Sequence, residues 1–304
     1  MSFDTLLTLR GPLRHPRQML ADQEYGGHAS IHDDATAETL GLRAGPIEGP
    51  THFSLFPPLL QHIWGQAWFE RGCISAHYLN MVVEGEATRA FADIPLAAAR
   101  STRVWVEKED GTPVLEASAS LGPDHAETLL EQRMRDLRPP ERLLILEDLR
   151  VGMTGAVDER VRMDADQHMG ALYPFSLKQK LAAITEASPW YSDASSPWGR
   201  AIIPLEMVSV LAEYSSASAR FPVKGPAVGL FADQEIRMID GPLFVGEEYL
   251  IRREIVALSE SRRTESYWVR SRIYDAAGVV PKAEMLLNHA TLKASYAGYA
   301  AGID

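Results

Sequence analysis

Residues 73–94, CISAHYLNMVVEGEATRAFADI, and residues 234–258, QEIRMIDGPLFVGEEYLIRREIVAL, show the same order of an apolar strand, a turn at Gly-Glu and a second strand. Gly85-Glu86 in the first stretch corresponds to Gly246-Glu247 in the second. Runs of alternating apolar and polar residues bounded by glycine turns are typical of antiparallel strands. Because the two stretches lie about 160 residues apart, they predict an internal repeat of one structural unit.

Each stretch is followed by a second hairpin and preceded by an apolar helical segment. Residues 100–122 turn at Asp110-Gly111, and residues 263–293 turn near Gly278, so each half is predicted to hold a meander of strands. Upstream of the two meanders, residues 50–70 and 204–219 are apolar at helical spacing and begin with proline. Each unit is therefore expected to contain one long helix and one antiparallel sheet.

The boundary between the units is predicted at Pro139-Pro140, which ends a charged helical segment at residues 124–142. This gives an N-terminal unit of residues 1–138 and a C-terminal unit of residues 141–296. The expected fold is α+β, with each sheet wrapped around its own helix to bury both apolar surfaces. Pairing of the two sheets would satisfy an exposed edge strand in each, so we expect an intrachain pseudo-dimer.

Composition excludes several classes of function. The net charge is −11 and the basic residues are scattered, whereas nucleic acid and anionic membranes require a concentrated positive patch. The one cysteine, Cys73, provides neither an intramolecular disulfide nor a zinc-cysteine framework, and the histidines show no spacing that demands a metal. Without a signal sequence or a run of about 20 apolar residues, a cytoplasmic protein is expected.

The segments before the two predicted helices carry a recognisable motif. Residues 26–34 are GGHASIHDD, and residues 185–193 are TEASPWYSD. Both resemble the pattern G-D-x-N-P-L-H-x-D of the MaoC-like hydratase/dehydratase group, whose double members have two hot-dog units in one chain. The resemblance implies a hot-dog fold for each unit, and a small-molecule substrate.

Neither copy of the motif is complete. The first keeps the histidine as His32 and has Gly27 where the family has its catalytic aspartate. The second offers Glu186 at the acidic position but has Tyr191 where the histidine belongs. The resemblance therefore implies one active site per chain, in the half that kept the imidazole.

The family chemistry adds water across an enoyl double bond, or removes it from a β-hydroxyacyl compound, and needs no cofactor. The resemblance assigns His32 as the general acid/base, because the pKa of an imidazole lies near neutrality. Gly49 is assigned as the donor to the substrate carbonyl at the start of the helix, where the backbone dipole helps and Pro50 has no N–H. A coenzyme A thioester is one candidate form of the substrate.

The missing carboxylate has two candidates. Glu48 ranks first by its position beside the helix start, and Glu186 ranks second by its place in the motif. His52 flanks the same helix start, and Trp190 and Tyr191 are candidates for the wall of a substrate pocket. Each of these residues also has an ordinary structural reading, as a helix cap, a surface charge, a salt bridge to arginine or an aromatic core filler.

Three functions remain open at this level. The leading hypothesis is a lyase of the hydratase/dehydratase type. A hot-dog thioesterase would use the same fold to direct water at the carbonyl, and a noncatalytic acyl-binding protein would account for the incomplete motif. Whether several copies of the chain assemble into a homo-oligomer is also left open.

Overall fold

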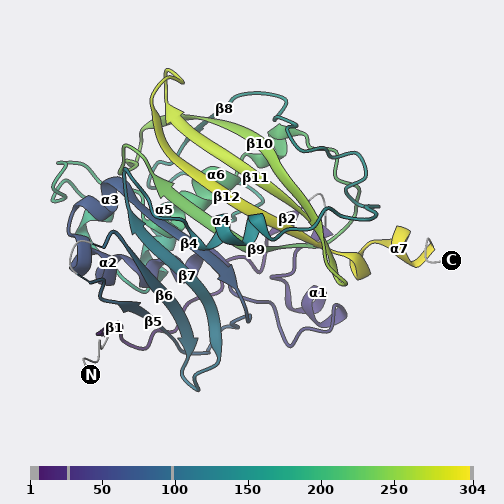
Figure 1. Cartoon of the computed structure of the whole chain (residues 1–304), viewed down its shortest axis with the longest axis horizontal. Helices are drawn as coiled ribbons and strands as arrows, with labels where there is room; N and C mark the ends of the chain where they lie inside the picture. The colour runs from purple at the N-terminus through teal and green to yellow at the C-terminus, as the bar shows by residue number, and fades with distance from the viewer. Residues whose placement is uncertain (1–6, 26–27, 97–98, 302–304) are drawn as a thin grey trace, which may run out of the picture.

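The computed structural model describes residues 7–25, 28–96 and 99–301 (Figure 1). One antiparallel sheet of ten strands runs through the whole molecule. The strands of its N-terminal half are, in spatial order, β1 (Thr8–Arg10), β5 (Thr88–Asp93), β6 (Ser101–Lys108), β7 (Pro113–Leu121) and β4 (Gly72–Tyr78). Those of its C-terminal half follow as β9 (Gly229–Met238), β12 (Pro281–Leu292), β11 (Thr264–Asp275), β10 (Glu248–Glu260) and β8 (Glu159–Arg162). A separate two-stranded ribbon joins β2 (Glu24–Tyr25) to β3 (His28–Ala29).

The strand order is symmetric about the central pair of β4 and β9, which we call the seam. Each half has a short outer strand, a meander of three strands and one inner strand at the seam. Across the seam the strands are antiparallel, with Ile74 opposite Ile236. The predicted α+β fold of two hot-dog units joined as an intrachain pseudo-dimer is confirmed. The boundary at Pro139-Pro140 stays a prediction.

The predicted meander is wrong in one respect. Residues 73–94 and 234–258 do not form hairpins, because β4 pairs with β7 and β9, and β9 pairs with β4 and β12. The meanders begin one strand later, at β5 and β10. The connection from β4 to β5 is too long for a tight turn, so it crosses the end of the sheet and β4 is free to pair at the seam.

Most of the helices and helical turns are short. They are α1 (Asp34–Thr39), η1 (Gly49–Leu55), α2 (Pro57–Trp64), α3 (Ala67–Arg71), α4 (Leu129–Arg135), α5 (Leu177–Ala183), η2 (Pro189–Tyr191), α6 (Leu205–Glu213), η3 (Ser216–Ala219), η4 (Lys293–Ser295) and α7 (Ala297–Ala301). The long helix predicted for residues 50–70 is divided into η1, α2 and α3. Pro57 starts a new helix because it has no N–H to continue the old one, and Gly65 ends that helix at φ 63°.

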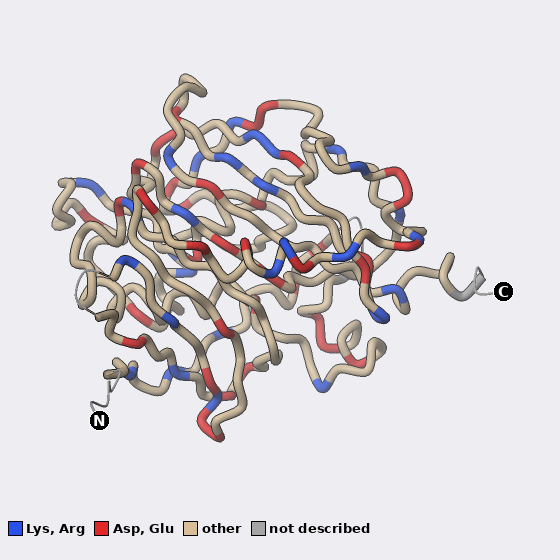
Figure 2. The backbone as a smooth tube through the Cα atoms, viewed as in Figure 1, with Lys and Arg blue, Asp and Glu red and all other residues tan. Residues whose placement is uncertain are grey.

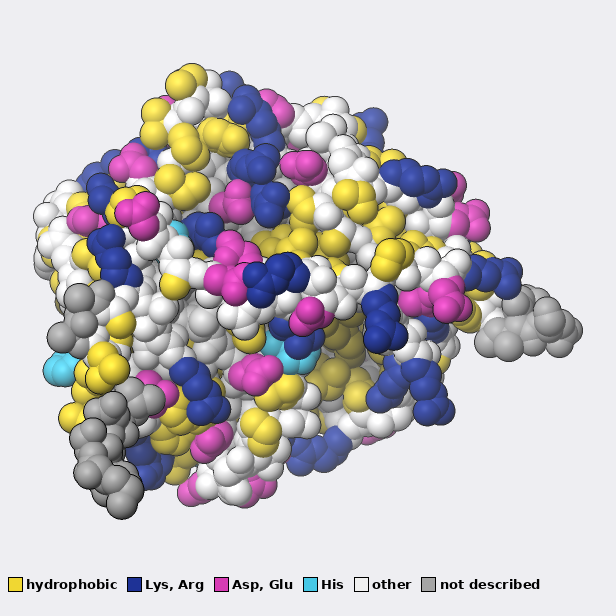
Figure 3. All heavy atoms as spheres, viewed as in Figure 1, with side chains coloured by type: hydrophobic (Ala, Val, Ile, Leu, Met, Phe, Trp, Pro, Cys, Tyr) yellow, Lys and Arg dark blue, Asp and Glu magenta, His cyan; other side chains and the backbone are white. Residues whose placement is uncertain are grey.

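The core lies on the inner face of the sheet, where η1 packs against α6 and both cover the seam. Every residue of α6 after Leu205 is buried, including its polar residues Glu206, Ser209 and Glu213. Among the described residues, no helix is long and apolar enough to cross a membrane. Lys and Arg are interspersed with Asp and Glu along the backbone (Figure 2), and the face drawn in Figure 3 mixes both with hydrophobic groups.

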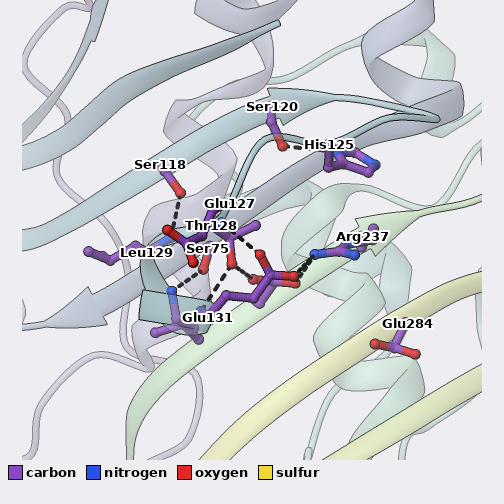
Figure 4. A network of polar contacts seen from close by, with 12 residues as sticks. Ser75, Ser118, Ser120, His125, Glu127, Thr128, Leu129, Glu131, Arg237 and Glu284 are labelled. Carbon is purple, nitrogen blue, oxygen red and sulfur yellow. Dashed lines mark hydrogen bonds and ion pairs between the residues drawn. The ribbon is translucent and has the colours of Figure 1, made fainter. Parts of the chain in front are cut away.

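The outer face of the seam is covered by α4, the helix that precedes the predicted boundary (Figure 4). Its cap, Thr128, forms a capping box with Glu131 and donates a hydrogen bond to Glu235 on β9 at 2.6 Å. The backbone N–H of Leu130 donates to the Ser75 hydroxyl on β4 at 3.0 Å, and Arg237 on β9 pairs with Glu131 at 3.1 Å. The linker between the two halves is thus attached to both inner strands.

We predict that residues 1–138 do not form a soluble monomer on their own. Without β9, the backbone edge of β4 and the apolar side chain of Ile74 lose their cover, and an unpaired apolar edge strand promotes association. Size-exclusion chromatography and circular dichroism of this fragment, beside the intact chain, should show aggregation or loss of strand signal. A monodisperse, folded fragment would contradict the pseudo-dimer.

Candidate active site

A cavity of about 300 Å³ opens beside the seam, between the two halves. The N-terminal half contributes His32, Glu48, Gly49, His52 and Tyr78 to its lining, so the structure brings four of the predicted site residues together. Most of the remaining lining is apolar. Leu79 and Met81 both line the cavity and are 42% and 38% exposed, which marks an apolar entrance at the surface.

His32 is held in one orientation by the loop around it. Its Nδ1 lies 2.6 Å from the carbonyl oxygen of Pro46. Because a carbonyl only accepts hydrogen bonds, Nδ1 carries the proton of the neutral ring and Nε2 keeps its lone pair. Burial lowers the pKa of His32 to about 4, with the Pro46 carbonyl opposing the shift. At neutral pH this imidazole is therefore an uncharged base.

Short local contacts fix that loop. Asp33 caps α1 by accepting a hydrogen bond from the N–H of Thr36 at 2.8 Å. The Asp34 carboxylate accepts from the N–H of Gly45 at 2.8 Å. A Cβ at Gly45 would lie 2.1 Å from the His32 carbonyl oxygen, so only glycine allows this approach. The motif position at Gly27 lies outside the described residues.

Glu48 stands at the start of η1 without capping it. Glu48 is 5% exposed, and its Oε1 has no hydrogen-bond partner among the described residues. Burial raises the pKa of Glu48 to about 7; Lys180 opposes the shift and Glu206 adds to it. A large share of this carboxyl group is therefore protonated at neutral pH and able to donate a proton.

Lys180 and Glu206 come from the C-terminal half and form a buried ion pair, with Nζ and Oε2 separated by 3.1 Å. Lys180 also donates a hydrogen bond to the Thr51 hydroxyl at 2.9 Å, which ties α5 to η1. His52 lies next to this pair, and its Nδ1 is buried without a hydrogen-bond partner among the described residues. Burial, Lys180 and Lys108 together lower the pKa of His52 to about 4.

Gly49 is the first residue of η1, so its N–H has no acceptor within that helix. A Cβ at Gly49 would meet the Tyr78 ring at 2.7 Å, which explains why this position has no side chain. The Tyr78 hydroxyl in turn donates to Gln234 of β9 at 2.9 Å, and Gln234 donates to Ser209 of α6 at 2.7 Å. This chain of hydrogen bonds fixes the floor of the cavity to the seam.

The second copy of the motif lies elsewhere. Glu186 forms a two-point ion pair with Arg14, at 2.6 Å and 3.1 Å, and does not line the cavity. Trp190 packs edge-on against Phe69 at 5.3 Å between ring centroids, and Tyr191 is buried in the core. Neither ring lines the cavity, so the surroundings of both rings match the alternative considered from the sequence, in which they fill the protein interior.

Sequence reasoning missed the cavity residues that come from the C-terminal half, among them Tyr173, Glu213, Tyr267 and His289. The weak sequence signal for Glu213 was a carboxylate at the end of a mainly apolar helical stretch. Among the described residues, no group of His, Cys, Asp and Glu is arranged to hold a metal ion.

No protein-family model and no curated protein matches this sequence. Solved structures do match. A MaoC-domain dehydratase from Chloroflexus aurantiacus is 14% identical, with a TM-score of 0.57 over 95% of this chain and 96% of its own. A Mycobacterium tuberculosis protein described as having a double hot-dog fold is 12% identical, with a TM-score of 0.56 over 95% of this chain and 97% of its own. A further MaoC-like dehydratase is 11% identical, with a TM-score of 0.51 over 94% of this chain and 97% of its own. The predicted resemblance to MaoC-like double hot-dog proteins is confirmed for the fold.

Glu48 should make the stability of the protein pH-dependent. Its folded pKa of about 7 exceeds the ordinary 4.5, so its contribution to stability is full below the ordinary value and is lost as the pH rises through 7. At about 1.36 kcal/mol per pKa unit, the full loss amounts to about 3 kcal/mol, most of it between about pH 5 and about pH 8. Urea unfolding at about pH 5 and about pH 8 should show Glu48→Gln losing less stability than the wild type over this interval. An equal loss in both proteins would mean that Glu48 titrates normally.

Proposed function

We propose that this chain is a hydratase/dehydratase that adds water to an enoyl compound or removes it from a β-hydroxyacyl compound. One observation carries the proposal: an uncharged imidazole base, His32, and a protonatable carboxyl, Glu48, line the same apolar cavity. Their environments separate their proton affinities in the way that paired acid and base catalysts require. That two of the structural neighbours are dehydratases adds support.

In the hydration direction, Nε2 of His32 takes a proton from water while the water oxygen bonds to the β-carbon. Glu48 gives its proton to the α-carbon, so the double bond becomes a single bond and the elements of water are added. His32 is then charged and Glu48 ionised, and transfer of one proton from His32 to Glu48 restores both. Dehydration follows the same steps in reverse, and no cofactor enters the balance.

The substrate carbonyl is proposed to accept a hydrogen bond from the N–H of Gly49. Negative charge develops on that oxygen during addition, and a donor fixed in an apolar cavity stabilises it more than water would. A thioester suits this role, with coenzyme A as one candidate carrier. The apolar lining would bind the acyl chain and exclude bulk water.

A single assay distinguishes the proposed hydratase/dehydratase from two other functions. The purified protein is incubated with enoyl and β-hydroxyacyl thioesters, and both water addition and free thiol are followed. Water gain or loss without thiol supports the lyase. Thiol release supports a thioesterase, and binding without either change supports a noncatalytic acyl-binding protein.

We predict that His32→Ala lowers turnover by about 10²–10⁴-fold, the usual contribution of a general acid/base. Tyr191→Phe, at the equivalent position of the second motif, should change turnover little because Tyr191 does not line the cavity. Turnover and thermal unfolding of both variants are measured on whichever thioester reacts. Normal turnover in His32→Ala, or loss caused by unfolding alone, removes His32 from the mechanism.

The carboxylate is tested by a matched pair of variants. Glu48→Gln keeps the shape of the side chain but cannot give up a proton, so turnover should fall by at least about 100-fold. Glu186→Gln changes a carboxylate that is paired with Arg14 outside the cavity, and turnover should stay near the wild-type value. The opposite ranking in steady-state kinetics would move the catalytic acid to Glu186, and full activity in both would exclude both.

A further inference from the structure

The C-terminal half contributes a second polar wall to the cavity, which the proposed reaction does not use. Glu213, the last residue of α6, and His289 of β12 both line it. Tyr173 also lines the cavity and is influenced by carboxyl groups from both halves. Burial raises the pKa of Tyr173, and both Glu48 and Glu213 raise it further. Ionisable groups from both halves of the chain therefore lie within electrostatic reach of the same phenol.

Glu213 belongs to a buried cluster that contains two carboxylates and one guanidinium. Arg253 contacts Glu213 Oε1 at 2.9 Å and both oxygens of Glu159 at 2.8 Å and 2.9 Å. All three side chains are at most 4% exposed. With every group ionised, the cluster holds one uncompensated negative charge, which is costly in an apolar surrounding. Burial raises the pKa of Glu213 to about 7, and Arg253 opposes the shift.

The remaining oxygen of Glu213, Oε2, lies 3.7 Å from Nε2 of His289. This separation is longer than a hydrogen bond. Glu213 also has a side-chain hydrogen bond with Ser216, which lines the same cavity. A ligand group that approached from the cavity could bond both Glu213 and His289, whose own contact is weak. A carboxyl oxygen and a ring nitrogen are thus presented side by side.

The His289 ring is fixed by aromatic neighbours. It stacks on Tyr267 at 4.7 Å between centroids and 10° between planes, and it meets Phe231 edge-on at 5.5 Å and 90°. At this point the pairing of β12 with β9 contains a bulge, so that His289 faces Phe231 while Asn288 faces Asp233. The extra residue, Ala232, lines the cavity beside Phe231. Bulges commonly re-aim side chains next to functional sites.

We propose that Glu213 and His289 bind a hydroxyl group on the acyl part of the substrate, away from the thioester. A hydroxyl group both donates and accepts, so it can donate to an ionised Glu213 while accepting from a protonated Nε2 of His289, or accept from a protonated Glu213 while donating to an unprotonated Nε2. A charged ammonium or carboxylate group would lose its hydration in this largely apolar cavity, which costs more free energy than burying a neutral hydroxyl group. The inference deepens the proposed function and rests on it for the identity of the substrate as an acyl thioester.

The test measures binding without turnover. Saturated pantetheine thioesters of butanoyl, hexanoyl and octanoyl chains have no double bond to hydrate, and each is compared with its terminally hydroxylated counterpart by titration calorimetry. For at least one length, the wild type should bind the hydroxylated member about tenfold more tightly or better, the value of one or two hydrogen bonds to a charged or polar pair.

Variants then locate the effect. His289→Phe keeps the ring stacking but removes the nitrogens, and Glu213→Met removes the acceptor while Arg253 stays paired with Glu159. In both variants, the ratio of the dissociation constants of the plain and the hydroxylated thioester should fall to near one. The ratio is used because a general weakening of thioester binding affects both constants equally. His62→Phe changes an exposed histidine outside the cavity and should keep the wild-type ratio.

Equal affinity for both members at every length, or no binding of either, would overturn the inference. So would a wild-type ratio that survives in both cavity variants. Thermal unfolding checks that each variant is folded, and if one is not, the other decides. A hydroxyl preference in a protein that turns over no enoyl thioester would leave this inference standing while the proposed hydratase reaction failed.

Discussion

The antiparallel pairing of β4 with β9 is the constraint on which the rest of the molecule depends. Each half alone would end in an open strand edge, and the seam satisfies both edges at once. Because side chains alternate along a strand, the register that places Ile74 opposite Ile236 also decides which of the two faces of the sheet each seam residue occupies. Tyr78 turns inward, where it lines the cavity and donates a hydrogen bond to Gln234, whereas Ser75 turns outward to α4.

The same pairing brings groups of opposite charge together across the two halves. Lys180, from the C-terminal half, lies close enough to Glu48 and His52 of the N-terminal half to shift the pKa of both. The dominant cause in each case is burial, which favours the uncharged form of an acid and of a base alike. Burial also lowers the pKa of His32 to about 4. An acid that keeps its proton, Glu48, and a base that stays free of one, His32, can therefore coexist at neutral pH, which is the condition that the proposed reaction requires.

Much of the fold follows from local sequence signals. The glycine turns at Gly111 and Gly278 have positive φ as a tight hairpin requires, and the cap at Asp33 forms as its residue type favours. Local signals failed where a distant partner decides the outcome. Nothing in residues 73–94 indicates that β4 prefers β9 and β7 to β5, because pairing depends on which edges meet after folding. The single long helix expected for residues 50–70 does not form, for a reason that is present in the local sequence, namely the prolines at positions 57 and 58.

The sequence by itself determined the repeat, its α+β character and the presence of a motif histidine, His32, in only one of the two halves. Each of these features rests on residue type and on spacing within a short stretch. Only the tertiary structure decided that Glu186 pairs with Arg14, that Glu48 shares a cavity with His32, and that Glu213 and His289 face that cavity from the other half. The physical reason is that ion pairing and pKa depend on burial and on neighbours more than a hundred residues away in the chain, which only the packing of the two halves brings within reach.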